Sequence, residues 1–228
     1  MQNVTIDNTI PAFNWDRGTE IYRPLRISYP AGELVYKTGS YAAGVYLISG
    51  GLVSDHCPVE NGETKKLPIE ILGPGDLIGL EIFLEDQNGV HLSCAHAVTD
   101  TVLRFFQRET FLKMLQAEQE MTRYCLKYLS RRFYYLKQWR SAFFNLPLET
   151  RLARVLLTLV EKCADGQQEA VALPPEITKA MLSQLLGVST AKVSKALASL
   201  PEISLHKQGI LVSSAPLQLR LASASSRL

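Results

Sequence analysis

The spacing of the hydrophobic residues changes near residue 108. Residues 1–20 show no clear period and predict an irregular arm. From residue 21 onward, short runs of β-branched and aromatic residues alternate with turns of Gly, Pro, Asn and Asp, which is typical of a β-sandwich or barrel. Asn61 and Gly62 favour a tight hairpin, because both accept positive φ angles. The strand-like runs include ELVYK, GVYLISG, GLVSDHCPV, KKLPIEIL and TVLRFF.

Beyond residue 108 the spacing becomes helical. Residues 108–117 predict a short helix, and residues 118–144, which contain no Gly or Pro, predict one of about 40 Å at 1.5 Å per residue. Apolar residues recur along the long helix every three or four positions, so it needs a partner surface. That surface is the chain's own β domain, the same helix of a second subunit, or both, and we favour both. The residues that we assign to dimerisation are Met121, Cys125, Tyr128, Leu129, Phe133, Leu136, Trp139 and Phe143.

Two further helices follow a proline break. Residues 148–164 predict an amphipathic helix, and the stretch ITKAMLSQLLGVSTAKVSKALASLP, residues 177–201, contains a helix pair. Thr178 and Ser189 are N-cap residues for the two short helices, and Gly187 supplies the left-handed turn between them. Two short helices joined at a glycine turn predict a helix-turn-helix motif. The alternative is a helical hairpin that serves only for packing.

The outward face of the second short helix is small or basic and carries no acid. Small side chains let a helix enter the major groove of DNA, and Lys and Ser can bond base edges or phosphates. The residues ISLHKQGILVSS then predict two strands around a basic tip, as in a winged extension that touches the DNA backbone. The candidate DNA contacts are Thr190, Ala191, Lys192, Ser194 and Lys195 on the helix, and His206 and Lys207 at the wing tip.

The charge distribution favours an anionic partner for this end of the chain. The net charge is only +2, but residues 178–228 carry six Lys or Arg residues against Glu202 alone. A solvated basic face is the plain alternative. No apolar stretch is long enough to span a bilayer, the N-terminus has no secretory pattern, and the four cysteines have no zinc-finger or redox spacing. A cytoplasmic protein without a membrane partner is therefore expected.

The stretch PGDLIGLEIFLEDQNGVHLSCA, residues 74–95, has the turns of an anion cradle but contains no Arg or Lys. Gly79, Glu81 and Ser93 are its candidate effector contacts. Cys94, near the end of this stretch, and His96, just beyond it, share one side of an expected strand, and ordinary strand roles are their simplest interpretation.

With these motifs the chain resembles the cyclic-AMP receptor protein/FNR family of bacterial transcription regulators. The helix-turn-helix stretch, PGDLIG and LETRLARVLLTL carry the resemblance, which extends over residues 21–214. It implies an α+β fold with a cyclic-nucleotide-binding-type β-roll (a double-stranded β-helix), a long dimerisation helix and a winged helix-turn-helix. The expected ranges are 1–20 for the arm, 21–117 for the β-roll sensor, 118–146 for the dimerisation helix and hinge, and 147–228 for the DNA-binding domain.

The resemblance also implies roles for single residues. Lys195 falls where an Arg commonly reads guanine, whereas Thr190 and Ala191 replace residues that often read bases, so a different half-site is expected. The residues that fall on the family's phosphate contacts are Thr178, Lys179 and Ser189.

For the β-roll the resemblance argues against cyclic AMP. Members that bind it carry a Gly-Glu pair and an Arg-Ser pair, but here one residue separates Gly79 from Glu81, and Leu92 stands in place of the Arg. On the long helix, Leu136 and Lys137 stand near the positions where such members place adenine-binding hydroxyls. Without the cation, the phosphate charge would be buried with only partial compensation, which is unfavourable.

The predicted function is a homodimeric, sequence-specific transcription regulator that reads a near-palindromic operator, needs no cofactor or metal, and is not an enzyme. Its expected partners are double-stranded DNA, a second copy of the chain, RNA polymerase and a small-molecule effector of open identity. Phe143 and Phe144 are the hinge candidates. The alternatives are a cupin-like barrel with an enzymatic role, a β domain that serves only as a scaffold, and a haem or redox sensor. Haem-binding members of the family use Cys and His ligands, so the resemblance makes Cys94 and His96 the candidate haem ligands.

Overall fold

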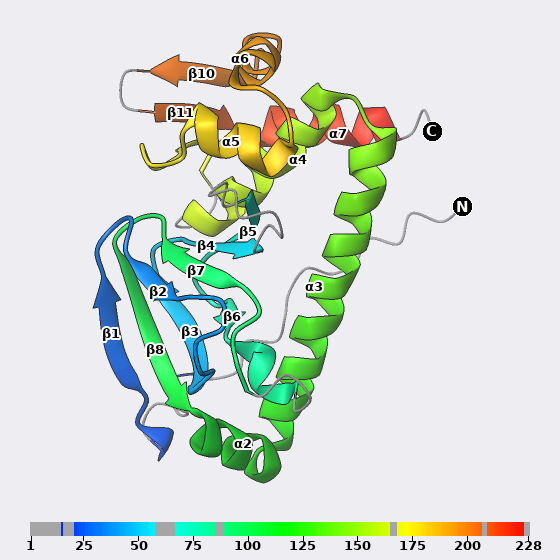
Figure 1. The fold of residues 1–228 in the computed structure, drawn as a ribbon. Coiled ribbons are helices and arrows are strands. Elements are labelled where there is room, and N and C mark those ends of the chain that lie inside the picture. Colours follow the sequence, from blue (N-terminus) through cyan, green and yellow to red (C-terminus); the bar gives the residue numbers. More distant parts are fainter. Residues whose placement is uncertain are drawn as a thin grey trace.

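The computed structural model describes Trp15 and residues 21–57, 67–84, 89–164, 168–206 and 209–225. It has an α+β architecture, with a β-roll at one end, a helix-rich unit at the other, and one long helix running between them (Figure 1). The predicted hairpin at Asn61 and Gly62, the predicted arm apart from Trp15, and the wing-tip residue Lys207 lie outside the described residues.

The β-roll consists of two antiparallel four-stranded sheets whose facing sides form a common core. The runs singled out in the sequence form β2, β3, β4, β5 and β8. The strand expected at Cys94 and His96 is β7, whereas β1 and the two-residue β6 were not singled out. One sheet has the order β1-β8-β3-β6, with bounds Leu25–Tyr29, Thr101–Gln107, Gly44–Gly50 and Leu77–Ile78. The other has the order β2-β7-β4-β5, with bounds Leu34–Tyr36, Cys94–Ala97, Val53–Cys57 and Leu67–Leu72.

Two helices leave the β-roll, and both were predicted. Helix α2 (Arg108–Ala117) begins directly after β8, and α3 (Gln119–Asn145) runs for 27 residues past the roll to the C-terminal unit (Figure 1). One face of α3 lies on the roll, where the Tyr128 hydroxyl donates to the Leu77 carbonyl and accepts from the Leu77 amide, both at 3.0 Å. These paired bonds satisfy buried backbone groups at the start of β6.

Three of the residues that we assigned to dimerisation instead pack within the chain. Met121, Cys125 and Tyr128, which we expected at a dimer contact, are buried in the chain's own β-roll cluster. An apolar stripe of this spacing does not distinguish between two partner surfaces, because both need the same helical period. In the structure, one part of the stripe packs within the chain, and only the remainder is exposed.

The C-terminal unit contains the predicted helix-turn-helix and wing, and one helix that the sequence analysis missed. Helix α7 follows the wing directly and packs on α4. Its sequence signal is weak, because Leu217 alone is fully buried among residues 214–222, whose burial is described, and Pro216 stands in its first turn. The bounds are Leu148–Cys163 for α4, Ala170–Ala172 for β9, Lys179–Leu186 for α5, Thr190–Ala198 for α6, Ile203–His206 for β10, Gly209–Ser213 for β11 and Ser214–Ser225 for α7.

The C-terminal unit packs directly on the end of the β-roll. Leu52, Ile71 and Val98 of the roll belong to the same hydrophobic cluster as the buried residues of α4, α5 and α6. At the edge of this contact Lys162 forms an ion pair with Asp76, whose carboxylate also accepts the Gly73 amide at 2.8 Å. The two parts therefore share one core.

Candidate nucleic-acid interface and effector site

Two hydroxyl caps and one glycine set the angle of the helix-turn-helix. The Thr178 hydroxyl accepts the Met181 amide at 3.2 Å and begins α5, and the Ser189 hydroxyl accepts the Lys192 amide at 3.4 Å and begins α6. Between them Gly187 has φ 64° and ψ 35°, a left-handed conformation that glycine adopts without strain. All three features agree with the sequence prediction.

Helix α6 separates its packing residues from its exposed ones. Val193, Ala196 and Leu197 are buried in the core of the C-terminal unit. The opposite face is open to solvent, and its described side chains include no carboxylate. The candidate contacts that are exposed are Thr178, Lys179, Ser189, Thr190, Ala191, Lys192 and Lys195, with Ser194 half-buried and His206 exposed at the end of β10.

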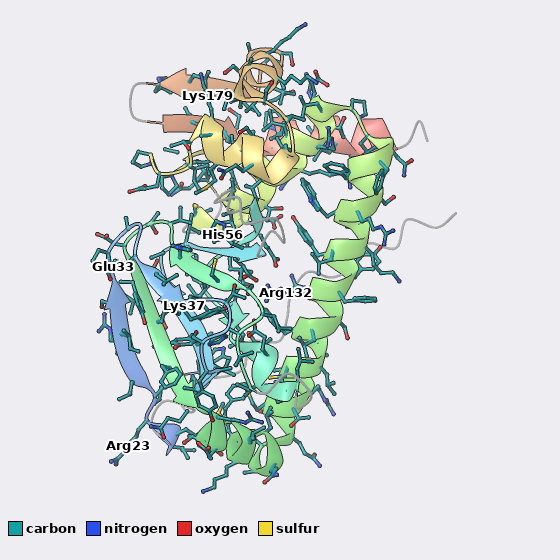
Figure 2. The ribbon with its side chains drawn as sticks, in the orientation of Figure 1. Arg23, Glu33, Lys37, His56, Arg132 and Lys179 are labelled. Carbon is teal, nitrogen blue, oxygen red and sulfur yellow. The ribbon has the colours of Figure 1, made fainter. Side chains whose placement is uncertain are left out.

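Glu202, the acidic residue of residues 178–228, does not neutralise the lysines of the helix pair. Its carboxylate accepts a hydrogen bond from the Arg220 guanidinium at 2.7 Å, so Arg220 of α7 compensates its charge. Lys179 lies at the start of α5, on the unit farthest from Arg23 of the β-roll (Figure 2). The basic side chains of the helix pair are thus concentrated at one end of the molecule.

The end of α3 contacts the turn of the helix-turn-helix. A Cβ atom on Gly187 would lie 3.4 Å from the Phe143 ring, and the Arg151 guanidinium lies 4.9 Å from the centre of that ring. Arg151 also donates to the carbonyl of Leu186 at 3.4 Å. A rotation of α3 would therefore displace Phe143 and change its contact with the turn that positions α6. Phe144, the second hinge candidate, is exposed.

In the β-roll the candidate effector residues form a hydrogen-bonded cluster. The Glu81 carboxylate accepts Nδ1 of His91 and the hydroxyl of Ser93, each at 3.4 Å. The His91 ring is buried and stacks on Tyr36, with ring centres 3.7 Å apart. Gly79, two residues before Glu81, has a φ of 80°. A Cβ atom on Gly79 would lie 2.7 Å from the Gly44 carbonyl oxygen, so this position requires glycine.

Hydrogen bonds within the cluster already stabilise the charged form of Glu81. Burial alone would raise the pKa of Glu81, but hydrogen bonds from His91, the backbone and Ser93 together hold this pKa below its usual value. Burial, together with the charges of Asp55 and Glu81, raises the pKa of Tyr36, so its phenol stays neutral. The Leu92 side chain, which replaces the expected cation, is 40% exposed.

Arg132 forms an ionic contact between α3 and the β-roll that the sequence analysis missed. From α3 it reaches the β-roll, where Nε lies 2.9 Å from Glu70, Nη2 lies 3.3 Å from Asp55, and Nη1 donates to the Leu77 carbonyl at 3.3 Å (Figure 2). A signal existed, because Arg132 follows Cys125 by seven residues, and seven residues on a helix return to one face. A charged residue on a buried face requires charged partners.

The remaining effector candidates have other neighbours. The Lys137 Nζ lies over the Phe133 ring, 4.9 Å from its centre. Leu136 lines a cavity between α3 and α4, together with Trp139. Hence neither Leu136 nor Lys137 takes part in the hydrogen bonds around Glu81 within the described chain.

The haem candidates lie beside two further polar residues. In the register of β4 and β7, Cys94 stands opposite His56, and His96 stands opposite Ser54. The Ser54 hydroxyl lies 2.7 Å from Nε2 of His56, and the two imidazole rings have centres 5.1 Å apart. Within the described ranges, no three His, Cys, Asp or Glu side chains are arranged to hold a metal ion.

The exposed face of α3 carries a heptad pattern. Leu126 and Phe133, seven residues apart, are 63% and 62% exposed. Leu129, Leu136 and Phe143 follow at the same interval on the adjacent row, and all three are exposed. Alternating spacings of three and four are typical of the seam of a two-stranded coiled coil.

Among the described residues, no helix is both long and apolar enough to cross a membrane.

Comparison with known proteins agrees with this arrangement. The family described as "Cyclic nucleotide-binding domain" matches residues 26–118. A "CRP-like cAMP-activated global transcriptional regulator" from Mycobacterium tuberculosis is 25% identical over 191 residues, covering 82% of this chain and 83% of that protein.

Solved structures share the fold over most of the chain. FixK2 from Bradyrhizobium japonicum superimposes with a TM-score of 0.72 at 20% identity, covering 86% of this chain and 96% of that one. A transcriptional regulator of the CRP/FNR family from Thermus thermophilus gives a TM-score of 0.67 at 21% identity, covering 87% and 98%. At these identities the similarity shows the order and packing of the elements.

Proposed function

Because the chain belongs to the cyclic-AMP receptor protein/FNR family and is a transcription regulator of that type, we propose that it binds a near-palindromic DNA site as a homodimer, without control by cyclic AMP. The observation that carries the proposal is the capped helix pair, whose second helix exposes small and basic side chains and no acid. Its relatives are regulators rather than enzymes, and we propose no catalytic role.

The proposed roles of the helix residues follow from their positions. Thr178, Lys179 and Ser189 stand at helix N-termini, where hydroxyls and ammonium groups can contact phosphates. Lys195 projects from the exposed face one turn further along, where it would reach base edges. Thr190 and Ala191 are small enough to allow close approach of the helix to the groove floor, with Lys192 and Ser194 beside them.

The proposed dimer pairs the exposed heptad face of α3 with that of a second copy. In a parallel arrangement Leu126, Leu129, Phe133, Leu136 and Phe143 would each meet their own counterpart across the two-fold axis. This pairing would place two recognition helices at half-sites about one helical turn apart. We place this activity in the cytoplasm, with RNA polymerase as the further partner.

The β-roll cluster supports control by something other than cyclic AMP. Glu81 is already held by His91 and Ser93, and the chain has no Arg or Lys in residues 74–95. Arg132 brings a cation to the roll, but two carboxylates already compensate it. Among the described side chains, no Arg or Lys is hydrogen-bonded to Glu81, His91 or Ser93, so a phosphate buried beside them would lack a compensating cation.

Cyclic AMP is accordingly expected to leave the thermal midpoint unchanged. A ligand that binds only the folded state stabilises it by about 2.7 kcal/mol at 100 times its dissociation constant, which is a shift of several degrees. The measurement is thermal unfolding of the protein with and without about 1 mM cyclic AMP, with a DNA site as the positive control. A midpoint that rises and saturates with cyclic AMP would refute this part of the proposal.

Two lysine substitutions are expected to have different effects on DNA binding. Lys195→Ala should reduce the preference for the selected site by about 1–3 kcal/mol, because a base contact is lost. Lys179→Ala should weaken binding to all sequences alike and lower the slope of log K against log salt by about 1, because one phosphate contact is lost. The measurement is titration of a site selected from random DNA, and of a scrambled site, at several salt concentrations.

Lys113→Ala serves as the matched control, since it removes the same exposed charge from α2 of the β-roll. It should leave both affinities nearly unchanged. If parent binding showed no salt dependence, or if Lys113→Ala weakened binding as much as Lys179→Ala, the proposed interface would be refuted.

A further inference from the structure

A cavity lies where the three parts of the molecule meet. It is found between α3 and α4 at the end of the β-roll, and it has a volume of about 50 Å³. A single water needs roughly 10–15 Å³ by this measure, so the cavity has room for several heavy atoms. Its lining residues are Glu70 and Ile71 of β5, Tyr135, Leu136 and Trp139 of α3, Val155, Thr158 and Leu159 of α4, and Leu185 of α5.

The lining is mainly apolar, and four of its side chains carry polar atoms: Glu70, Tyr135, Thr158 and, through its indole N–H, Trp139. Most of the wall is aliphatic or indole, and the Tyr135 hydroxyl contacts the Thr158 hydroxyl. Glu70 is the acid of the lining, and it is already paired with Arg132 at 2.9 Å. No Lys, Arg or His is among the lining residues of this described cavity. The cavity thus offers hydrogen bonds without a free charge.

We propose that this cavity binds a small uncharged molecule with an aliphatic or aromatic body and one hydroxyl or amide group. The apolar wall would cover the body. The hydroxyl oxygens of Tyr135 and Thr158 would accept a hydrogen bond from the polar group, because they already bond each other and Thr158 donates to the Arg154 carbonyl at 3.1 Å. An anion is excluded, because it would lie beside Glu70 with no cation to compensate it. The site is distinct from the cluster of Glu81, His91 and Ser93.

Occupancy of this cavity couples the sensor to the DNA-binding unit. The ligand would contact β5, α3, α4 and α5 at once, so it would favour the arrangement in which these elements enclose it. Leu185 lies on α5, two residues before the Gly187 turn that positions α6. A change in DNA affinity on the order of tenfold is expected, within the usual range of allosteric coupling. This consequence rests on the proposed function, whereas binding itself does not.

The tryptophans provide a direct test of binding. The chain has two, and Trp139 lines the cavity, so a full-length Trp15→Phe protein reports on the cavity by fluorescence. The probe is cyclohexanol, and its charged counterpart is cyclohexanecarboxylate. We expect saturable binding of cyclohexanol with a dissociation constant on the order of 1 mM, and at least tenfold weaker binding of the carboxylate. Calorimetry on the unsubstituted protein repeats the measurement without the substitution.

Two variants locate the binding. Thr158→Phe places a ring in the cavity and should abolish the cyclohexanol signal, whereas Thr150→Phe makes the same change on α4 outside the lining and should leave it intact. Thr158→Val removes only the hydroxyl, so it should weaken cyclohexanol several-fold without weakening methylcyclohexane. Binding that survives Thr158→Phe in a protein that unfolds cooperatively would overturn the proposal, as would equal affinity for the alcohol and the carboxylate.

The DNA measurement separates the two proposals. If cyclohexanol binds, and is lost in Thr158→Phe, but no DNA sequence is bound, the cavity site stands and the proposed function fails. If DNA is bound and cyclohexanol is not, the proposed function stands and the cavity site fails. If both bind, saturating cyclohexanol should shift the DNA affinity of the parent and leave that of Thr158→Phe unchanged, and an identical shift in both proteins would refute coupling through the cavity.

Discussion

A Phe133→Asp protein is expected to be monomeric and to bind its DNA site at least about 100-fold more weakly than the parent. Phe133 is 62% exposed at the centre of the heptad face of α3, so the change removes apolar area that lies outside the chain's own core. Two carboxylates would then face each other across the two-fold axis in a desolvated seam. Losing the dimer removes the second half-site contact, which contributes to affinity through effective concentration.

Sedimentation velocity and DNA titration together check this expectation. Leu219→Asp is the matched control, because Leu219 is 73% exposed but belongs to α7 and not to the heptad face of α3. It should remain dimeric and bind DNA like the parent. A Phe133→Asp protein that stays dimeric would show that another surface holds the two copies together. A monomer with parental DNA affinity would contradict the two-half-site mechanism.

An Arg132→Met protein is expected to lose about 3 kcal/mol of unfolding free energy at neutral pH, which is typical when one partner of a buried ion pair is removed. The guanidinium compensates both Asp55 and Glu70 and satisfies the Leu77 carbonyl, and Met provides none of these interactions. Urea unfolding measures the loss. Arg131→Met on the same helix is the control, since Arg131 carries the same charge without reaching these carboxylates, and it should cost less than about 0.5 kcal/mol.

The loss caused by Arg132→Met should also depend on pH. Burial raises the pKa of Glu70 above its ordinary value of 4.5, and the charge of Arg132 opposes that rise, so removing Arg132 raises this pKa further. Just above pH 4.5 the folded variant then binds more protons than its unfolded state, and its stability falls as pH increases. The deficit against the parent should therefore be smaller near pH 5 than near pH 7.5. Equal deficits at both would show that lost packing, not charge, is responsible.

The helix-turn-helix could be predicted from the sequence because its determinants are local. Thr178 and Ser189 cap helices through amides three residues away, and Gly187 adopts its turn by its own backbone freedom. The apolar residues of α6 recur within a single helix, so their burial follows from the period. Such signals need no knowledge of where the rest of the chain lies.

The features that escaped prediction depend on distant partners. Arg132 meets Glu70 and Asp55, which are 62 and 77 residues away, and no local pattern specifies that pairing. Met121 and Leu129 belong to one stripe by spacing, yet the first faces the β-roll and the second faces solvent. The cavity beside Trp139 likewise arises only when three separate parts of the chain pack together.

The separation of buried and exposed residues on α6 has an evolutionary consequence. Val193, Ala196 and Leu197 are buried, whereas Thr190 and Lys195 are exposed and outside the hydrophobic core. Mutations at the exposed positions can therefore accumulate with little effect on folding, since surface changes usually alter stability by less than about 0.5 kcal/mol. A duplicated copy of such a gene could drift to a new set of promoters while its protein continued to fold.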